Sequence, residues 1–333
     1  FKQKTAYEML RSLVGSEMCI RDRAAAEYQN YLEAFSDPSG IVEALKGKGW
    51  ALTACGRHAE AAECFERAYG LATDPADREL CLVKAADSLF ANRQYKRAMD
   101  AYGNALRIFA GSDRAAELKF QKAECSARVE GPAAAANLFL ELAGAAPAGP
   151  LAARALLRAA ELKAAQGGLI EALEIYGRCL AANPERQTRA AALFGAGSVQ
   201  YRLGMFKDAI ANFEMLVRDS ADCPSAEQAY LMRGWCHLMM RDEAAAAAVF
   251  DSFARLYPRS EWAADAMFQV GEMDYNRGRY AEAETRFLAL ARDCTNSPLA
   301  DTALFWAGRA AMEQGEYLSL IHISEPTRLL SIS

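Results

Sequence analysis

The sequence predicts an all-α solenoid, a row of antiparallel helix pairs that repeat the same packing along the chain. The first observation is a small residue followed four positions later by an aromatic residue, a pattern that recurs every 37 residues over most of the 333-residue chain. The second is another small residue twelve positions before that pair. The third is abundant alanine with few β-branched residues, a composition that favours helices. A fixed interval of this length is typical of stacked repeats.

The small and aromatic residues of each pair lie on one face of the second helix of a repeat, because four positions are close to one helical turn. A small side chain lets two helix axes approach, and the ring fills the space beside that contact. The pairs are Ala24/Tyr28, Ala61/Phe65, Ala98/Tyr102, Ala135/Phe139, Ala172/Tyr176, Ala209/Phe213, Ala246/Phe250 and Ala283/Phe287.

The first helix of each repeat carries the other small residue, and a turn follows it by seven positions. These small residues are Gly49, Ala86, Ala123, Ala160, Gly197, Gly234, Gly271 and Gly308, and the turn glycines are Gly56, Gly167, Gly204, Gly278 and Gly315. In one repeat Gly131-Pro132 stands a residue later, where proline in the first helical turn has no hydrogen bond to lose. The spacing predicts, for example, a first helix over Trp262–Arg277 and a second over Tyr280–Arg292.

Prolines mark the joints between repeats, because proline in a helix interior removes a hydrogen bond and clashes with the preceding turn. We expect seven full repeats between two half repeats, since Ala24 already belongs to a second helix and Gly308 to a first one. The prolines at the joints are Pro38, Pro75, Pro147, Pro150, Pro184, Pro224, Pro258 and Pro298.

The two ends of the chain are expected to be foreign to the repeat protein. Leu13–Arg23 and Leu318–Arg328 can be encoded by one DNA segment and its reverse complement, as sequencing adaptors read through into an open reading frame would be. We therefore expect residues 1–23 and 318–333 to be adaptor-derived and to add little to the core. The expected solenoid spans residues 24–317.

The pattern resembles the tetratricopeptide repeat (TPR) family over essentially all of residues 24–317. The small and aromatic positions match most fully between Gly271 and Phe287, although the family's common repeat is 34 residues long and these repeats have 37. The resemblance implies a right-handed superhelix whose first helices line a concave groove. Segment 257–260 (YPRS) is similar to bacterial cell-envelope members, among them the outer-membrane assembly lipoprotein and the Tol–Pal coordinator.

Composition narrows the function classes. The net charge is −5, and the chain lacks the Lys/Arg runs with which nucleic-acid-binding proteins neutralise phosphates. No apolar stretch approaches the roughly 18 residues that a membrane helix needs. Eight of the nine cysteines lie within residues 24–317, and we expect them to be buried thiols that replace small apolar residues. Such cysteines favour a reducing compartment.

No catalytic, metal or cofactor site is expected. The histidines of the repeat region, His58 and His237, have no Cys, Asp or Glu at a recurring ligand spacing. HExxH, GxSxG and phosphate-binding glycine motifs do not occur in the sequence. Glu60, Glu63 and Glu66 share a helix face, and their like charge indicates a solvated surface. We therefore expect no enzyme activity and no small-molecule substrate.

The concave groove is the expected binding site. The resemblance implies that ligands meet recurring positions of the first helices, and an aromatic-lined groove with polar neighbours suits an extended or helical peptide. Tryptophan and tyrosine often anchor such partners. The candidate site residues at these positions are Trp50, Phe90, Tyr201, Trp235, Tyr275, Arg154, Glu272 and Arg309.

Packing is the alternative role for aromatic residues at helical spacing. One recurring position of the first helix is apolar in seven of eight repeats, which indicates core: Val83, Phe120, Leu157, Phe194, Leu231, Phe268 and Phe305. Lys46 holds that position in the remaining repeat, and Trp50 stands where the family's clamp for C-terminal carboxylates needs asparagine. We therefore do not expect binding of chaperone C-termini.

The sequence thus predicts a bacterial scaffold that binds a partner protein or peptide in its groove, in the periplasm or at the cell envelope. Two alternatives stay open. One is the superhelical arm of a larger enzyme whose catalytic domain lies outside this sequence, and the other is a cytoplasmic regulatory adaptor, which the cysteines favour. A signal peptide or lipobox at the true N-terminus would separate the envelope from the cytoplasm.

Overall fold

The computed structural model describes residues 17–34, 38–145 and 149–315, and over these ranges the chain forms α-helices joined by turns, with no strand. The all-α prediction is confirmed. The helices are α2 (Glu17–Ala34), α3 (Pro38–Ala54), α4 (His58–Leu71), α5 (Pro75–Ala91), α6 (Tyr95–Ile108), α7 (Ala115–Val129), α8 (Pro132–Ala145), α9 (Pro150–Ala165), α10 (Leu169–Ala181), α11 (Arg186–Arg202), α12 (Phe206–Asp219), α13 (Ser225–Met239), α14 (Glu243–Leu256), α15 (Ala263–Asn276), α16 (Tyr280–Asp293) and α17 (Leu299–Glu313).

The helices alternate in role as the 37-residue interval requires. Odd-numbered helices from α3 to α17, called A helices below, carry the first small residue, and even-numbered helices from α2 to α16, called B helices, carry the small–aromatic pair. Between α2 and α17 the described chain contains seven A–B pairs, from α3–α4 to α15–α16. Helices α15 and α16 lie within one residue of the bounds that the spacing predicted.

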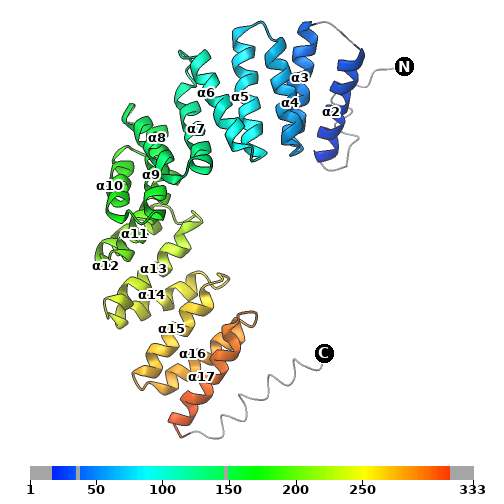
Figure 1. The fold of residues 1–333 in the computed structure, drawn as a ribbon. Helices are drawn as coiled ribbons and strands as arrows, with labels where there is room; N and C mark the ends of the chain where they lie inside the picture. Colours follow the sequence, from blue (N-terminus) through cyan, green and yellow to red (C-terminus); the bar gives the residue numbers. More distant parts are fainter. Residues whose placement is uncertain (1–16, 35–37, 146–148, 316–333) are drawn as a thin grey trace. The chain divides into compact units, whose positions relative to one another are not determined.

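The chain divides into two compact units, unit 1 from Phe1 to Gly168 and unit 2 from Leu169 to Ser333. Within each unit every helix packs antiparallel against the next one, as Figure 1 shows for α2–α9 and for α10–α17. Alternate helices also touch, at α7 and α9 in unit 1 and at α11/α13 and α15/α17 in unit 2. Each unit is therefore a row of helix hairpins in which most packing is local.

The small–aromatic pairs form the core of the helix rows within each unit. The seven alanines from Ala61 to Ala283 are fully buried, and the seven rings from Phe65 to Phe287 are at most 3% exposed. Where the A helix offers glycine, the ring lies on its backbone: a β-carbon at Gly234 would come within 2.5 Å of the ring of Phe250 on α14. The small residues therefore set the distance between the paired helices.

Tyr28 on α2 and Tyr176 on α10 lie instead against a glycine of the following A helix, and a β-carbon at Gly195 would come within 2.4 Å of Tyr176. Tyr28 is 39% exposed, and its ring lies against Gly47 of α3, where a β-carbon would come within 2.3 Å of it. Phe65, by contrast, packs on Gly49 in the A helix of its own repeat. Among the described residues no A helix precedes α2, which agrees with the greater exposure of Tyr28 than of the other rings in the series.

The segments expected to be foreign are described only in part. Residues 17–23 form the start of α2, where Arg21 donates a hydrogen bond to the backbone carbonyl of Ala54 at 3.3 Å. Residues 1–16 and 318–333 lie outside the described ranges. Their origin, and with it the boundaries of the repeat domain, stays a prediction.

A left-handed residue closes the turns from A to B helices. Arg93 (φ 59°) and Arg241 (φ 61°) hold this conformation in two turns where the sequence has no glycine. The Arg279 N–H donates back to the Asp274 carbonyl at 2.9 Å, the bond of a Schellman turn. In the other turns the left-handed residue is glycine, as the spacing predicted: Gly56, Gly131, Gly167, Gly204, Gly278 and Gly315.

Prolines stand where A helices begin. Pro75 and Pro150 occupy the first turns of α5 and α9, and Pro224 and Pro298 occupy the N-cap positions of α13 and α17. Their fixed φ angle suits the first helical turn, where the missing N–H costs nothing. Pro147 lies outside the described residues.

Five of the cysteines in the described residues are buried within helices, and three half-buried ones lie in turns between helices, where the expected burial is incomplete. Burial raises the pKa of the Cys125 thiol to about 12 and those of the Cys81 and Cys236 thiols to about 11. Because the thiolate is the reactive form, thiols with such pKa values are unreactive at neutral pH. The buried cysteines are Cys64, Cys81, Cys125, Cys179 and Cys236, and the half-buried ones are Cys55, Cys223 and Cys294.

Candidate protein-binding faces

All eight candidate site residues lie on A helices. Trp50 on α3, Phe90 on α5 and Arg154 on α9 belong to unit 1. Unit 2 holds the other five, with Tyr201 on α11, Trp235 on α13, Glu272 and Tyr275 on α15, and Arg309 on α17.

The two candidate tryptophans rest on buried rings of the B helices. Trp50 meets Phe65 edge to face with ring centroids 5.7 Å apart, and Trp235 meets Phe250 in the same way at 5.4 Å. Trp50 nevertheless keeps 45% of its surface exposed, and Trp235 is half-buried. Each indole is therefore held by the core on one side and open on the other.

The other candidate rings lie at the ends of A helices and contact the ring that begins the following B helix. Phe90 meets Tyr95 at 5.4 Å, and Tyr201 meets Phe206 at 5.6 Å. Tyr275 meets Tyr280 at 5.2 Å in the same edge-to-face arrangement. These half-buried rings fix the A–B turns and also present one face of each ring outside the core.

Cations from the next A helix lie over several of these rings. Lys84 Nζ stands 5.2 Å from the ring of Trp50, and the Arg154 guanidinium stands 4.6 Å from that of Phe120. Both pairs are 34 residues apart, one helical turn less than the 37-residue interval. Within about 6 Å of an aromatic face a cation is attracted by the ring quadrupole. The contacts therefore link neighbouring A helices along one surface.

In unit 1 these cations are neutralised by carboxylates. Lys84 pairs with Asp87 at 2.8 Å, and Arg154 pairs with Glu117 at 3.5 Å. Asp87 also accepts a hydrogen bond from the buried hydroxyl of Tyr102 at 2.7 Å. The A-helix surface of unit 1 thus presents rings bordered by ion pairs, with most of its charge already compensated.

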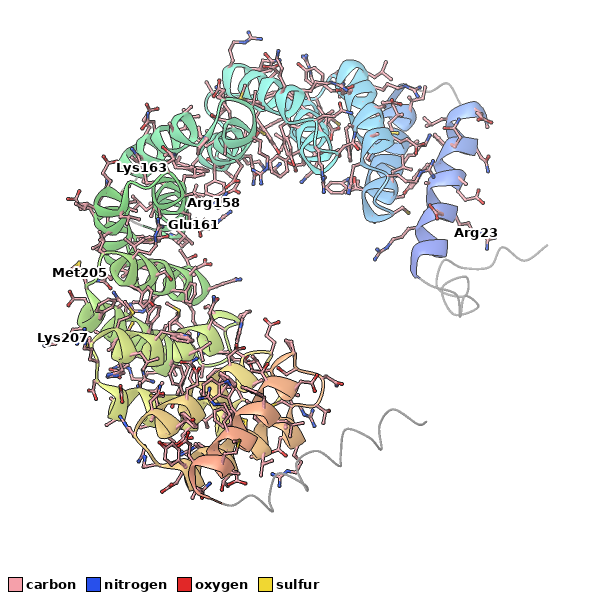
Figure 2. The ribbon with its side chains drawn as sticks, turned by 60° about the horizontal axis from the view of Figure 1, so that its bottom comes forward. Arg23, Arg158, Glu161, Lys163, Met205 and Lys207 are labelled. Carbon is pink, nitrogen blue, oxygen red and sulfur yellow. The ribbon has the colours of Figure 1, made fainter. Side chains whose placement is uncertain are left out.

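Glu124 on α7 is the centre of a largely buried ion-pair network in unit 1. Its side chain is only 12% exposed and accepts from Arg158 Nε at 2.5 Å and from Arg128 at 3.2 Å. Burial opposes its ionisation, but the two guanidinium groups outweigh that effect and hold the pKa of Glu124 below its ordinary value. Arg158 also pairs with Glu161, and Figure 2 shows both side chains on one side of α9 with Lys163 on the other.

In unit 2 the charged side chains of Glu272 on α15 and Arg309 on α17 have an amide and rings as their described neighbours in place of opposite charges. The Arg309 guanidinium lies 4.8 Å from the Trp306 ring and 5.6 Å from the Tyr275 ring, and these two rings meet edge to face at 5.2 Å. Glu272 is half-buried and accepts a hydrogen bond from Gln269 at 3.1 Å. Burial raises the pKa of Glu272 above its ordinary value, and the Gln269 hydrogen bond offsets this only in part.

The structure brings together Tyr275 and Arg309 among the candidate residues. The partners of the others were not among the candidates: Lys84 for Trp50, Arg128 for Phe90 at 5.5 Å, and Phe120 for Arg154. The 34-residue offset between a ring and a cation was present in the sequence and could have indicated two of these pairs. The Arg128 contact depends on a side chain that crosses from α7 to the end of α5.

The core alternative holds for most, but not all, of the recurring apolar positions. Val83, Phe120, Leu231 and Phe268 are at most 9% exposed, whereas Phe305 is 64% exposed. Phe120 and Phe268 are covered by B-helix rings, and α17 has no B helix after it among the described residues. The packing expectation was therefore wrong for Phe305.

Within residues 17–34, 38–145 and 149–315 no cluster of three or more His, Cys, Asp or Glu side chains could hold a metal ion. Over the same ranges none of the helices combines the length and apolarity required to cross a bilayer.

Rows of helix hairpins with a small–aromatic core define an α-helical repeat protein. The family model of the tetratricopeptide repeat matches residues 21–77, 194–261 and 271–318, more than half of the chain, and the protein belongs to this family. A comparison with curated proteins gives no match.

Solved structures of TPR proteins resemble the fold. One, from Parabacteroides merdae ATCC 43184, is 17% identical, with 80% of this chain and 98% of that chain covered and a TM-score of 0.50. Another, the C-terminal part of a TPR repeat-containing protein from Cytophaga hutchinsonii, is 13% identical, with 75% and 99% covered and a TM-score of 0.56. At these identities the likeness concerns the fold alone.

Proposed function

We propose that this protein is a scaffold that binds partner proteins or peptides on the A-helix faces of its units. TPR solenoids generally serve protein–protein interaction. The observation that carries the proposal is the contrast between two aromatic series: the seven rings of the small–aromatic pairs from Phe65 to Phe287 are at most 3% exposed, whereas Trp50 on α3 is 45% exposed. A large ring held at its base and open above is the usual anchor of a protein interface.

The polar surroundings of these rings also support binding. A cation over a ring holds its own side chain in place, which lowers the entropy lost when a partner docks. In unit 1 most of these cations are already paired, so the Trp50 indole and its apolar surroundings are the expected source of affinity there. We infer that the described chain binds rather than catalyses, and that neither nucleic acid nor a small molecule is its ligand.

Selection from a phage library of random dodecapeptides tests this function. The full chain should enrich a set of peptides, and Trp50→Ala or Trp235→Ala should reduce their capture by about tenfold, the loss typical of an interface anchor. Leu71→Ala and Leu256→Ala are matched controls, because these exposed side chains lie on B helices of the same two units. Equal losses in the control variants would contradict binding on the A-helix faces.

We also propose that the protein acts in the periplasm or at the cell envelope. The support is the similarity of segment 257–260 to envelope members of the family. Recovery of the intact gene upstream of residue 24 tests this proposal. A signal peptide or lipobox in frame would support it, and a start codon without either would indicate the cytoplasmic adaptor instead.

A further inference from the structure

Arg309 differs from the other cations on the A-helix surfaces in its lack of a described carboxylate partner. Among the described residues, the cations that lie over A-helix rings in the other repeats are each within 3.5 Å of a carboxylate: Lys84, Arg128, Arg154 and Arg233. Arg309 also lies over A-helix rings, those of Tyr275 and Trp306, but no described carboxylate is within salt-bridge distance of it. Its charge is therefore oriented by the rings and not compensated.

Glu272 is a carboxylate on the same surface that likewise lacks a described partner of opposite charge. Glu272 follows Glu124 and Glu161 in the 37-residue series, and both of those pair with Arg158. Glu272 instead accepts from the neutral Gln269 amide, with no described cation within salt-bridge distance. A half-buried carboxylate without a counter-ion loses hydration that nothing nearby replaces, which agrees with the upward shift of its pKa.

Unit 1 contains an ion pair with the same spacing, at a repeat position seven residues earlier. Glu272 and Arg309 are 37 residues apart on the contacting helices α15 and α17, as Glu117 and Arg154 are on α7 and α9. The unit 1 pair closes at 3.5 Å. In unit 2 Trp306 adds a second ring next to Tyr275, and Arg309 lies over both rings. The pair therefore stays open.

We propose that Glu272 and Arg309 are an open ion pair that a partner peptide closes. A basic side chain of the peptide meets the Glu272 carboxylate, an acidic one meets the Arg309 guanidinium, and the segment between them covers Tyr275 and Trp306. The planar guanidinium suits a carboxylate because it can donate two parallel hydrogen bonds. This inference rests on the proposed function, and it names the unit and the charge pattern of the partner.

The experiment uses the dodecapeptide selection on the full chain, followed by affinity measurements with a synthetic selected peptide. Peptides that bind unit 2 should carry both a basic and an acidic residue. Glu272→Gln and Arg309→Gln should each weaken the binding of such a peptide by about tenfold, because one charge is then left unpaired at the interface. The matched controls are Glu282→Gln and Arg259→Gln, exposed charges of the same unit, which should leave the affinity unchanged.

A charge exchange separates recognition from a folding defect. Glu272→Lys should lose the original peptide and gain the peptide whose basic residue is changed to glutamate. Peptides that lack either charge, or affinities unchanged in both glutamine variants, would overturn the inference. If Trp235→Ala abolishes the binding of the selected peptides while Glu272→Gln does not, the proposed function stands and the inference fails. If the wild-type chain selects no peptide, both fail.

Discussion

The ring of Phe287 on α16 lies on the backbone of Gly271 on α15, where an added β-carbon would stand 2.7 Å from the ring. Alanine occupies the position of Gly271 in three other repeats, at residues 86, 123 and 160. The residue at this position, glycine or alanine, therefore helps to set the distance between the two helices that it joins. The same close contact recurs at Gly49/Phe65, Gly197/Phe213 and Gly234/Phe250.

Gly271→Ala is expected to destabilise the protein despite the better helix propensity of alanine. The β-carbon would force a buried ring to move, and overpacking of this kind costs about 1–3 kcal/mol, against a gain of about 1 kcal/mol from propensity. The urea midpoint, followed by circular dichroism, should fall. Gly177→Ala on α10 is the control: no atom lies within 4 Å of its β-carbon, so its midpoint should rise.

A substitution at Ala283 on α16 tests the B-helix side of the contact that Gly271 makes on the A helix α15. Ala283 is fully buried, and Ala283→Leu should cost about 1–3 kcal/mol because the added methyl groups have no space between α15 and α16. The same applies to Ala172 on α10. Ala281→Leu, an exposed neighbour on α16, should leave thermal stability nearly unchanged. Wild-type stability of Ala283→Leu would show that the repeat register is wrong.

Two turns should be improved by glycine. Arg93 and Arg241 are exposed and hold positive φ, a conformation that costs a residue with a β-carbon about 1–2 kcal/mol. Arg241→Gly should therefore raise the melting temperature, since the gain exceeds the greater chain entropy of glycine. The reverse change, Gly278→Ala at φ 73°, should lower it. Opposite signs for the two variants are the diagnostic result.

These turns also show which features of the structure the sequence predicts and which it does not. The 37-residue interval predicts where each turn falls, but glycine was the only signal for its left-handed residue, so Arg93 and Arg241 were not recognised. The interval likewise predicts which helix face carries Trp50 and Tyr275. It does not predict which long side chain crosses to a ring on the next A helix, because that depends on rotamers and competing partners. The 34-residue offset predicts that Arg309 lies near Tyr275. It does not predict that no described carboxylate pairs with Arg309.

The network of Glu124 should matter most to the stability of unit 1. Arg158→Met removes the closest partner of a carboxylate that is 12% exposed, and unpairing a buried charge costs about 3–5 kcal/mol. We expect about 2–3 kcal/mol, since Arg128 still pairs with Glu124. The double variant Glu124→Gln/Arg158→Met should lose less than the sum of the single changes. An additive result in this double-mutant cycle would mean that the two residues do not interact.

The same network gives an acid dependence. The pKa of Glu124 lies below its ordinary value of 4.5 when the protein is folded, because the two arginines outweigh the effect of burial. Its contribution is therefore present above pH 4.5 and lost as the pH falls through the folded pKa. The free energy of unfolding of Glu124→Gln should vary less with pH below 4.5 than that of the wild type. Parallel curves would contradict this assignment.

Buried thiols give the opposite dependence at alkaline pH. The pKa of Cys125 is about 12 in the folded protein because burial disfavours the thiolate, against an ordinary value of 9.0. Above pH 9 the unfolded chain loses this proton and the folded protein keeps it, so stability is present below pH 9 and lost as the pH rises toward 12. Each such thiol should reduce the free energy of unfolding by about 1.4 kcal/mol per pH unit in that window. Cys125→Ala should flatten the alkaline slope by that amount. A wild-type slope in Cys125→Ala would mean that the thiol ionises in the folded protein as readily as in the unfolded chain.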